Sequence, residues 1–196
     1  MAVLPAMQIS SAKHKYTGPN CLGSFCLEGG SRKKLAEAFG KLPKKETLYC
    51  YKSKDSKTFV QYFIEDEYKV NGKIVTTGSI ALTDFDNCNR SLTTSDPPET
   101  WKTPEGIGLG STEQEVIRAY GKPVQRETVA PAGNPGITAK QTADIMLAGG
   151  PIEQRKTPAN IGDTILTYDG QPEDLSFTWV LIRKGKVSGI RTGDSE

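Results

Sequence analysis

Histidine, which many enzymes use as a base, is scarce in this 196-residue chain. Its one histidine, His14, lies in a polar N-terminal stretch, there is no G-x-S-x-G motif, and no cysteine has a histidine partner near it in sequence. No run approaches the ~20 apolar residues of a membrane-spanning helix. The formal net charge is only +2, and so small a net charge does not produce an electrostatic field strong enough to attract nucleic acid. We therefore expect neither a transmembrane segment nor a nucleic-acid partner.

Motifs for metals and cofactors are also missing. The cysteines form no C-x-x-C pair, which argues against a zinc site, and "DFDNCN" lacks the glycine and the final acid of a calcium loop. The glycines of 106–110 do not follow a strand and do not have dinucleotide-loop spacing, and the Gly-Lys pair at 121–122 precedes a proline. We interpret these glycines as helix boundaries and predict no metal and no cofactor.

The four cysteines are better explained by disulfides, with free core cysteines as the alternative. They are even in number and all lie in the first half of the chain, but four cysteines allow three connectivities, and the sequence does not choose among them. Disulfides indicate an oxidising compartment, so we expect a secreted or periplasmic protein whose export signal is not among these residues. The disulfide candidates are Cys21, Cys26, Cys50 and Cys88.

One set of elements is predicted to occur twice. "GGSRKKLAEAFGKL" at 29–42 aligns without a gap with "GSTEQEVIRAYGKP" at 110–123, and strand-like segments follow both. Thr112 and Glu115 form a capping-box pattern, and Gly121 suits a helix C-terminus. Asn71-Gly72 and Gly185 indicate hairpin turns between strands. The segments predicted as strands are 47–51, 59–63, 164–168 and 177–181.

This order of elements predicts an α+β fold of two tandem repeats, each with short helices packed on one face of an antiparallel sheet. The first repeat, with all the cysteines, covers 1–95, and the second covers 104–196. Adjacent prolines mark 96–103 as the linker. A Pro/Gly/Ala-rich insertion at 128–162 distinguishes the second repeat, and long stretches of this kind are usually functional or disordered.

The stretch "GIGLGSTEQEVIRAYGKP", together with "LSFTWVLIRKGKVSGI", resembles the small α+β domain of the superfamily that contains the β-lactamase inhibitory protein and the small lipoprotein of the outer-membrane barrel-assembly machinery. The resemblance covers the second half of the chain apart from its insertion, and the first half in outline. It implies a protein that binds other proteins in the bacterial envelope and is not an enzyme. No residue of an inhibitory loop can be matched, so no contact residue is carried over.

We therefore expect a non-enzymatic, secreted or periplasmic protein-binding module of the bacterial envelope. Its partner is expected to contact an exposed sheet face and the loops at its rim, the 128–162 insertion in particular. One alternative is a small-molecule or lipid ligand between sheet and helices, and another is a carboxylate-based enzyme that uses Glu65, Asp66 and Glu67. The residues predicted for the partner-binding surface are Tyr49, Tyr51, Tyr62, Trp179, Ile145 and Met146.

Overall fold

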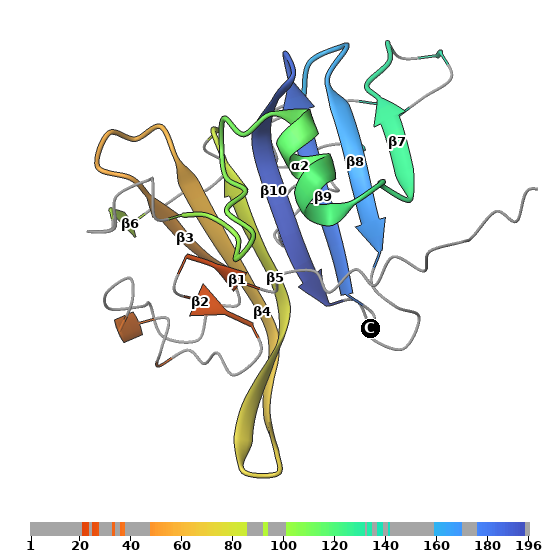
Figure 1. Ribbon diagram of the computed structural model, residues 1–196. Helices are drawn as coiled ribbons and strands as arrows, with labels where there is room; N and C mark the ends of the chain where they lie inside the picture. The colour runs from red at the N-terminus through yellow and green to blue at the C-terminus, as the bar shows by residue number, and fades with distance from the viewer. Residues whose placement is uncertain are drawn as a thin grey trace, which may run out of the picture.

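The computed structural model describes residues 21–23, 25–27, 33, 36–37, 48–85, 92–93, 101–131, 133–134, 137–138, 141, 159–169 and 176–194. These residues form a small two-stranded hairpin, a large sheet and one helix of seven residues or more, α2 (Figure 1). The bounds of the elements are β1 Cys21–Leu22, β2 Phe25–Cys26, β3 Leu48–Lys52, β4 Phe59–Val70, β5 Lys73–Thr83, β6 Leu92–Thr93, α2 Glu113–Tyr120, β7 Gln125–Thr128, β8 Thr164–Asp169, β9 Ser176–Arg183 and β10 Lys186–Asp194.

The large sheet has eight strands in the order β6-β3-β4-β5-β10-β9-β8-β7. All neighbours are antiparallel except β3 and β6, which run parallel. Strands from the first half of the chain occupy one side of the sheet and strands from the second half the other, and the two sets meet where β5 pairs with β10 (Figure 1).

The predicted α+β fold with two tandem repeats is wrong. The structure is mostly antiparallel sheet, and α2 is the one helix of seven residues or more in the described part of the chain. The strands of both halves share a single sheet because β10 pairs with β5, and the two backbones come so close there that a Cβ on Gly193 would overlap the carbonyl oxygen of Gly78. Alternation of residue types along the sequence predicts strands, but it does not show that a strand of the first half will pair with a strand of the second half.

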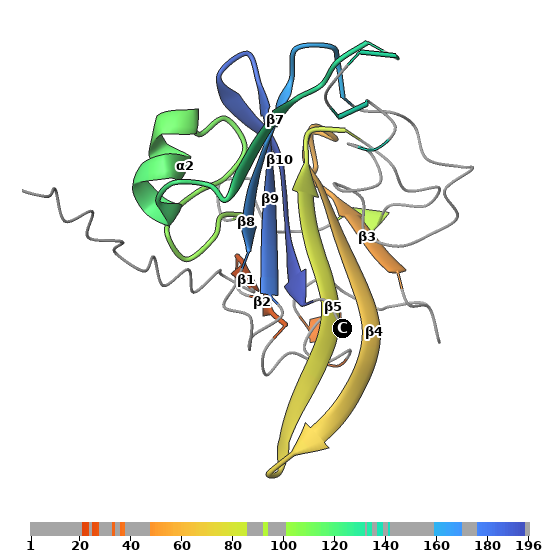
Figure 2. The same cartoon turned by 90° about the vertical axis from the view of Figure 1, so that its right-hand side faces the viewer.

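One hydrophobic cluster contains residues from both predicted domains and from the predicted linker. Trp101, 2% exposed, and Ile107 pack with strand residues of both halves, Ile80 of β5 and Val180 of β9 among them. The helix α2 covers the same face of the sheet, as Figure 2 shows, and buries Val116 there. The core thus lies mainly between the sheet and a layer made of α2, the segment before it and the β1–β2 hairpin.

The ends of α2 agree with the sequence. The Thr112 hydroxyl accepts a hydrogen bond from the Glu115 N–H at 3.2 Å, and a Glu115 carboxylate oxygen accepts one from the Thr112 N–H at 2.7 Å. Gly121 follows the helix with φ of 83° and donates its N–H to the carbonyl oxygen of Ile117. The predicted capping box and C-terminal glycine are confirmed. Within the described residues, no helix combines the length and the apolar character needed to cross a membrane.

Candidate partner-binding site

The β4–β5 hairpin extends well beyond the other strands of the sheet (Figures 1 and 2). Only residues 59–63 of β4 pair with β3, and only residues 79–83 of β5 pair with β10. Within the described part of the chain, residues 64–78 therefore pair with each other alone. We call this projecting segment the arm.

The turn and the base of the arm are set by residues that tolerate positive φ. Asn71 and Gly72 form its two-residue turn with φ of 51° and 80°, as the Asn-Gly signal predicts. At the base, Gly78 has φ of 138°, and a Cβ there would clash with the carbonyl oxygen of Phe63. The chain can cross between the sheet and the arm at this point because residue 78 has no side chain.

A β-bulge separates the buried from the exposed part of β4. Ile64 pairs with Gly78 and Glu67 with Thr76, so Glu65 and Asp66 together lie opposite a single residue of β5. Ile64 is completely buried, whereas Glu65 and Asp66 are exposed. The bulge is therefore the place where β4 leaves the core and presents two consecutive carboxylates to solvent.

The exposed side chains of the arm combine charge with an aromatic ring. No described cation forms an ion pair with Glu65 or Asp66. Tyr68 is 47% exposed, and Lys69 beside it is exposed. Carboxylates can accept charge-assisted hydrogen bonds from arginine or lysine, and a tyrosine ring supplies contact area with a polar end. The arrangement is suited to contact with a surface that carries basic groups.

The tyrosines predicted for a partner-binding surface lie in the core. Tyr49, Tyr51 and Tyr62 are 3%, 0% and 0% exposed, on the sheet face that α2 also covers. The rings of Tyr51 and Tyr62 meet edge to face with centroids 5.9 Å apart. Burial raises the pKa of Tyr51 far above that of a free tyrosine. Alternation along a strand identifies a shared face, but it does not say whether that face is covered.

Trp179 lies on the opposite face of the sheet and is half-buried. Its ring packs against Phe177 with centroids 4.1 Å apart, and the Arg191 guanidinium carbon lies 5.2 Å from the Trp179 ring centroid. Trp179 therefore belongs to a stacked group of cation and aromatic rings rather than to the arm. Ile145 and Met146 lie outside the described residues, as does much of the 128–162 insertion.

A cleft of about 300 Å³ lies between segment 105–111 and α2. Residues of the glycine-rich stretch line it, but their amides are used within the fold. Gly106 donates its N–H to the carbonyl oxygen of Thr103 at 2.8 Å, and Ile107 donates its N–H to the Thr103 hydroxyl at 3.2 Å. The cleft is also lined by two acids, Glu105 and Glu115, and by one cation, Arg118, so its lining has no excess of positive charge to attract phosphate. Nothing in this geometry resembles a phosphate loop.

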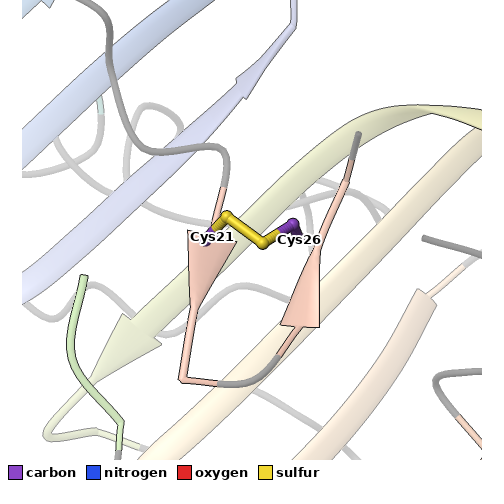
Figure 3. The surroundings of a disulfide bond; sticks show 2 residues. All are labelled: Cys21 and Cys26. Carbon is purple, nitrogen blue, oxygen red and sulfur yellow. A yellow bond between two sulfur atoms is a disulfide. The ribbon is translucent and has the colours of Figure 1, made fainter. Parts of the chain in front are cut away.

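The disulfide prediction is confirmed at Cys21 and Cys26, which pair directly opposite each other in the β1–β2 hairpin (Figure 3). Cys50 is also disulfide-bonded, and none of the described cysteines is a free thiol. Cys88, the fourth cysteine, lies outside the described residues.

Sequence reasoning missed Tyr68 and the arm as a unit. A signal was present in the run "FVQYFIEDEYKV" before Asn71, which forms the longest of the described strands. Its charged second half cannot belong to a buried strand. Length and charge together could have predicted a hairpin that extends beyond the sheet.

The chain was also compared with known proteins. No protein-family model, no curated protein and no solved structure matches it.

Proposed function

We propose that this chain is a non-enzymatic protein-binding module that contacts its partner through the arm. The observation that carries the proposal is the projection of residues 64–78 beyond the sheet, with Glu65, Asp66 and Tyr68 exposed. Beyond Ile64 the described side chains of the arm are not among the buried core residues. Burial of these side chains in the core therefore does not explain why the β4–β5 hairpin extends so far beyond the sheet.

A contact role explains the same features. An isolated two-stranded ribbon is at best marginally stable in water, so burial against another molecule would stabilise the arm. Bulges re-aim side chains and are common next to functional sites, and this one exposes two consecutive carboxylates. Charges on an unpaired strand edge also oppose indiscriminate sheet-to-sheet association. Together these features support recognition through side chains.

The partner surface should carry arginine or lysine, because Glu65 and Asp66 lack a cation within the described residues. Complementary charge mainly raises the association rate and makes it sensitive to salt. We also infer a secreted or periplasmic location, which the Cys21–Cys26 disulfide supports.

Comparative capture tests the proposal. The wild-type chain, a Glu65→Gln/Asp66→Asn/Tyr68→Ala variant and a Glu37→Gln/Glu105→Gln control are immobilised and exposed to an envelope extract, and bound proteins are quantified by mass spectrometry. Glu37 and Glu105 are exposed acids outside the arm, so the control also loses two negative charges. We expect at least one protein that the wild type and the control retain and the arm variant loses, with weaker capture at high salt.

Thermal unfolding of the three proteins checks that the arm variant is folded, since substitutions at exposed sites usually change stability by less than about 0.5 kcal/mol. If all three proteins capture the same set in equal amounts, the arm is not the contact element and the proposal fails.

A further inference from the structure

The β1–β2 hairpin has few interactions of its own. Each strand has two residues, which pair Cys21 with Cys26 and Leu22 with Phe25. A hairpin of this size is not stable by itself in water. The Cys21–Cys26 disulfide is a covalent cross-link that joins its two strands directly (Figure 3).

The hairpin lies on the helix-side face of the sheet. Leu22 and Leu27, 2% and 0% exposed, belong to the same core cluster as Ile80 of β5, and β1 contacts β5. The Gly23 N–H also donates to the carbonyl oxygen of Lys102 at 2.9 Å. The disulfide therefore fixes the shape in which the hairpin covers part of an apolar sheet face.

The two disulfide sites differ in their exposure to solvent. Cys21 and Cys26 are half-buried, whereas Cys50 is buried, with 9% of its surface exposed. Reduction of a disulfide requires a thiolate to reach one of its sulfur atoms, so access controls the rate. Cys21 and Cys26 are therefore more open to a reductant in solution than Cys50 is.

We propose that the Cys21–Cys26 disulfide is a redox-sensitive latch that holds the hairpin over the sheet. A dithiol reductant attacks one sulfur, forms a mixed disulfide, and resolves it with its second thiol. The reductant leaves as a disulfide after giving two electrons and two protons, and Cys21 and Cys26 become thiols. The hairpin, without its cross-link, separates from β5 and uncovers the apolar face around Ile80, while the rest of the sheet stays folded.

Controlled reduction of the full-length oxidised chain tests this. The protein is treated with increasing dithiothreitol under native conditions, free thiols are blocked with N-ethylmaleimide, and labelled peptides are quantified. We expect labelling at Cys21 and Cys26 on the order of tenfold faster than at Cys50, because exchange follows access. In the selectively reduced protein, amide hydrogen exchange should rise across residues 22–27 and around Ile80, with β8 and β9 unchanged.

A Cys21→Ser/Cys26→Ser variant should show the same local increase without reductant, and a Lys54→Ser/Lys57→Ser variant, which changes two exposed residues and keeps the disulfide, serves as the matched control. If the double cysteine variant does not fold, the treatment of the wild-type chain with increasing dithiothreitol still tests the proposal. Equal labelling rates at Cys50, or unchanged exchange of the hairpin after selective reduction, overturns the latch. Exchange that rises equally in β8 and β9 also overturns it, because the disulfide would then stabilise the whole fold.

Discussion

Single residues decide where this chain can bend, and Gly78 at the base of the arm is the sharpest case. Its φ of 138° and the clash of any Cβ with Phe63 exclude a side chain. Gly78→Ala should lower the free energy of unfolding by about 3 kcal/mol, because backbone must move to make room. Gly72→Ala is the matched control: its φ of 80° is unfavourable, but a Cβ there meets no atom within 4 Å, so the expected loss is about 1 kcal/mol.

Equilibrium unfolding in urea of both glycine variants and the wild type provides the measurement. Similar losses at Gly78 and Gly72 would mean that the arm shifts easily at its base and that strain alone sets the cost.

Glu115 shows how local hydrogen bonds change the pKa of a carboxyl group. Hydrogen bonds from the Thr112 backbone N–H, and then from the Thr112 hydroxyl, lower the pKa of the Glu115 carboxyl in the folded chain. The carboxylate therefore favours the folded state above the ordinary pKa of a glutamate, and this contribution is lost as pH falls through the lowered pKa. We expect the stability advantage of the wild type over Glu115→Gln at pH 7 to disappear under strongly acidic conditions.

A carbon-detected NMR titration of the Glu115 carboxyl group measures the pKa directly. The value should rise in a Thr112→Ala variant, which removes the hydroxyl contact. An ordinary glutamate pKa in the wild type would show that the capping box does not hold the carboxylate in solution.

At the scale of elements, α2 is held by one face of its surface. Val116 is completely buried against the sheet, whereas its neighbour Ile117 is 39% exposed. Val116→Ala should lower the free energy of unfolding by about 2 kcal/mol through lost burial and a residual cavity. Ile117→Ala should lower it by less than about 1 kcal/mol, because much of this side chain already contacts water. Urea unfolding of the two variants measures the difference, and a larger effect at Ile117 would contradict the packing of α2.

The same local rules explain how much of the fold the sequence predicted. The capping box at Thr112, the glycine at 121 and the Asn71-Gly72 turn depend on near neighbours, and the structure confirms all three. The fold class depends on distant pairing. The β5–β10 contact, which joins the two halves, and the covering of Tyr51 and Tyr62 are set by packing between remote segments, so periodicity did not reveal them.

The candidate site divides in the same way. Glu65 and Asp66 were noticed as a charged group, but their role as the start of a projecting arm depends on where β3 and β10 stop pairing. Both limits come from other strands. The length and charge of β4 indicate a hairpin that extends beyond the sheet, but they do not show at which residues β3 and β10 stop pairing.

For the whole molecule, one charged network ties together elements that are distant in sequence. Arg183 at the end of β9 contacts Asp163 before β8, with Nη2 to Oδ2 at 3.0 Å, and Asp84 after β5, with Nη1 to Oδ1 at 3.7 Å. The Ser188 hydroxyl donates to the same Asp84 at 2.6 Å. The network therefore connects β5, β8, β9 and β10 at one end of the sheet, where the two halves of the chain meet.

Removal of Arg183 should affect stability much more than removal of an exposed arginine. Asp163 is only 4% exposed, so Arg183→Ala leaves a buried carboxylate without its cation and should lower the free energy of unfolding by about 3 kcal/mol. Arg126→Ala is the control, because Arg126 is half-exposed in its pair with Glu113 and such pairs contribute less than about 1 kcal/mol. Adding Asp163→Asn to Arg183→Ala removes the buried, uncompensated charge and should recover part of the lost stability.

Urea unfolding of the four proteins separates these effects. Equal losses in the two single arginine variants, or no recovery in the double variant, would mean that the buried charge of Asp163 is not what Arg183 compensates.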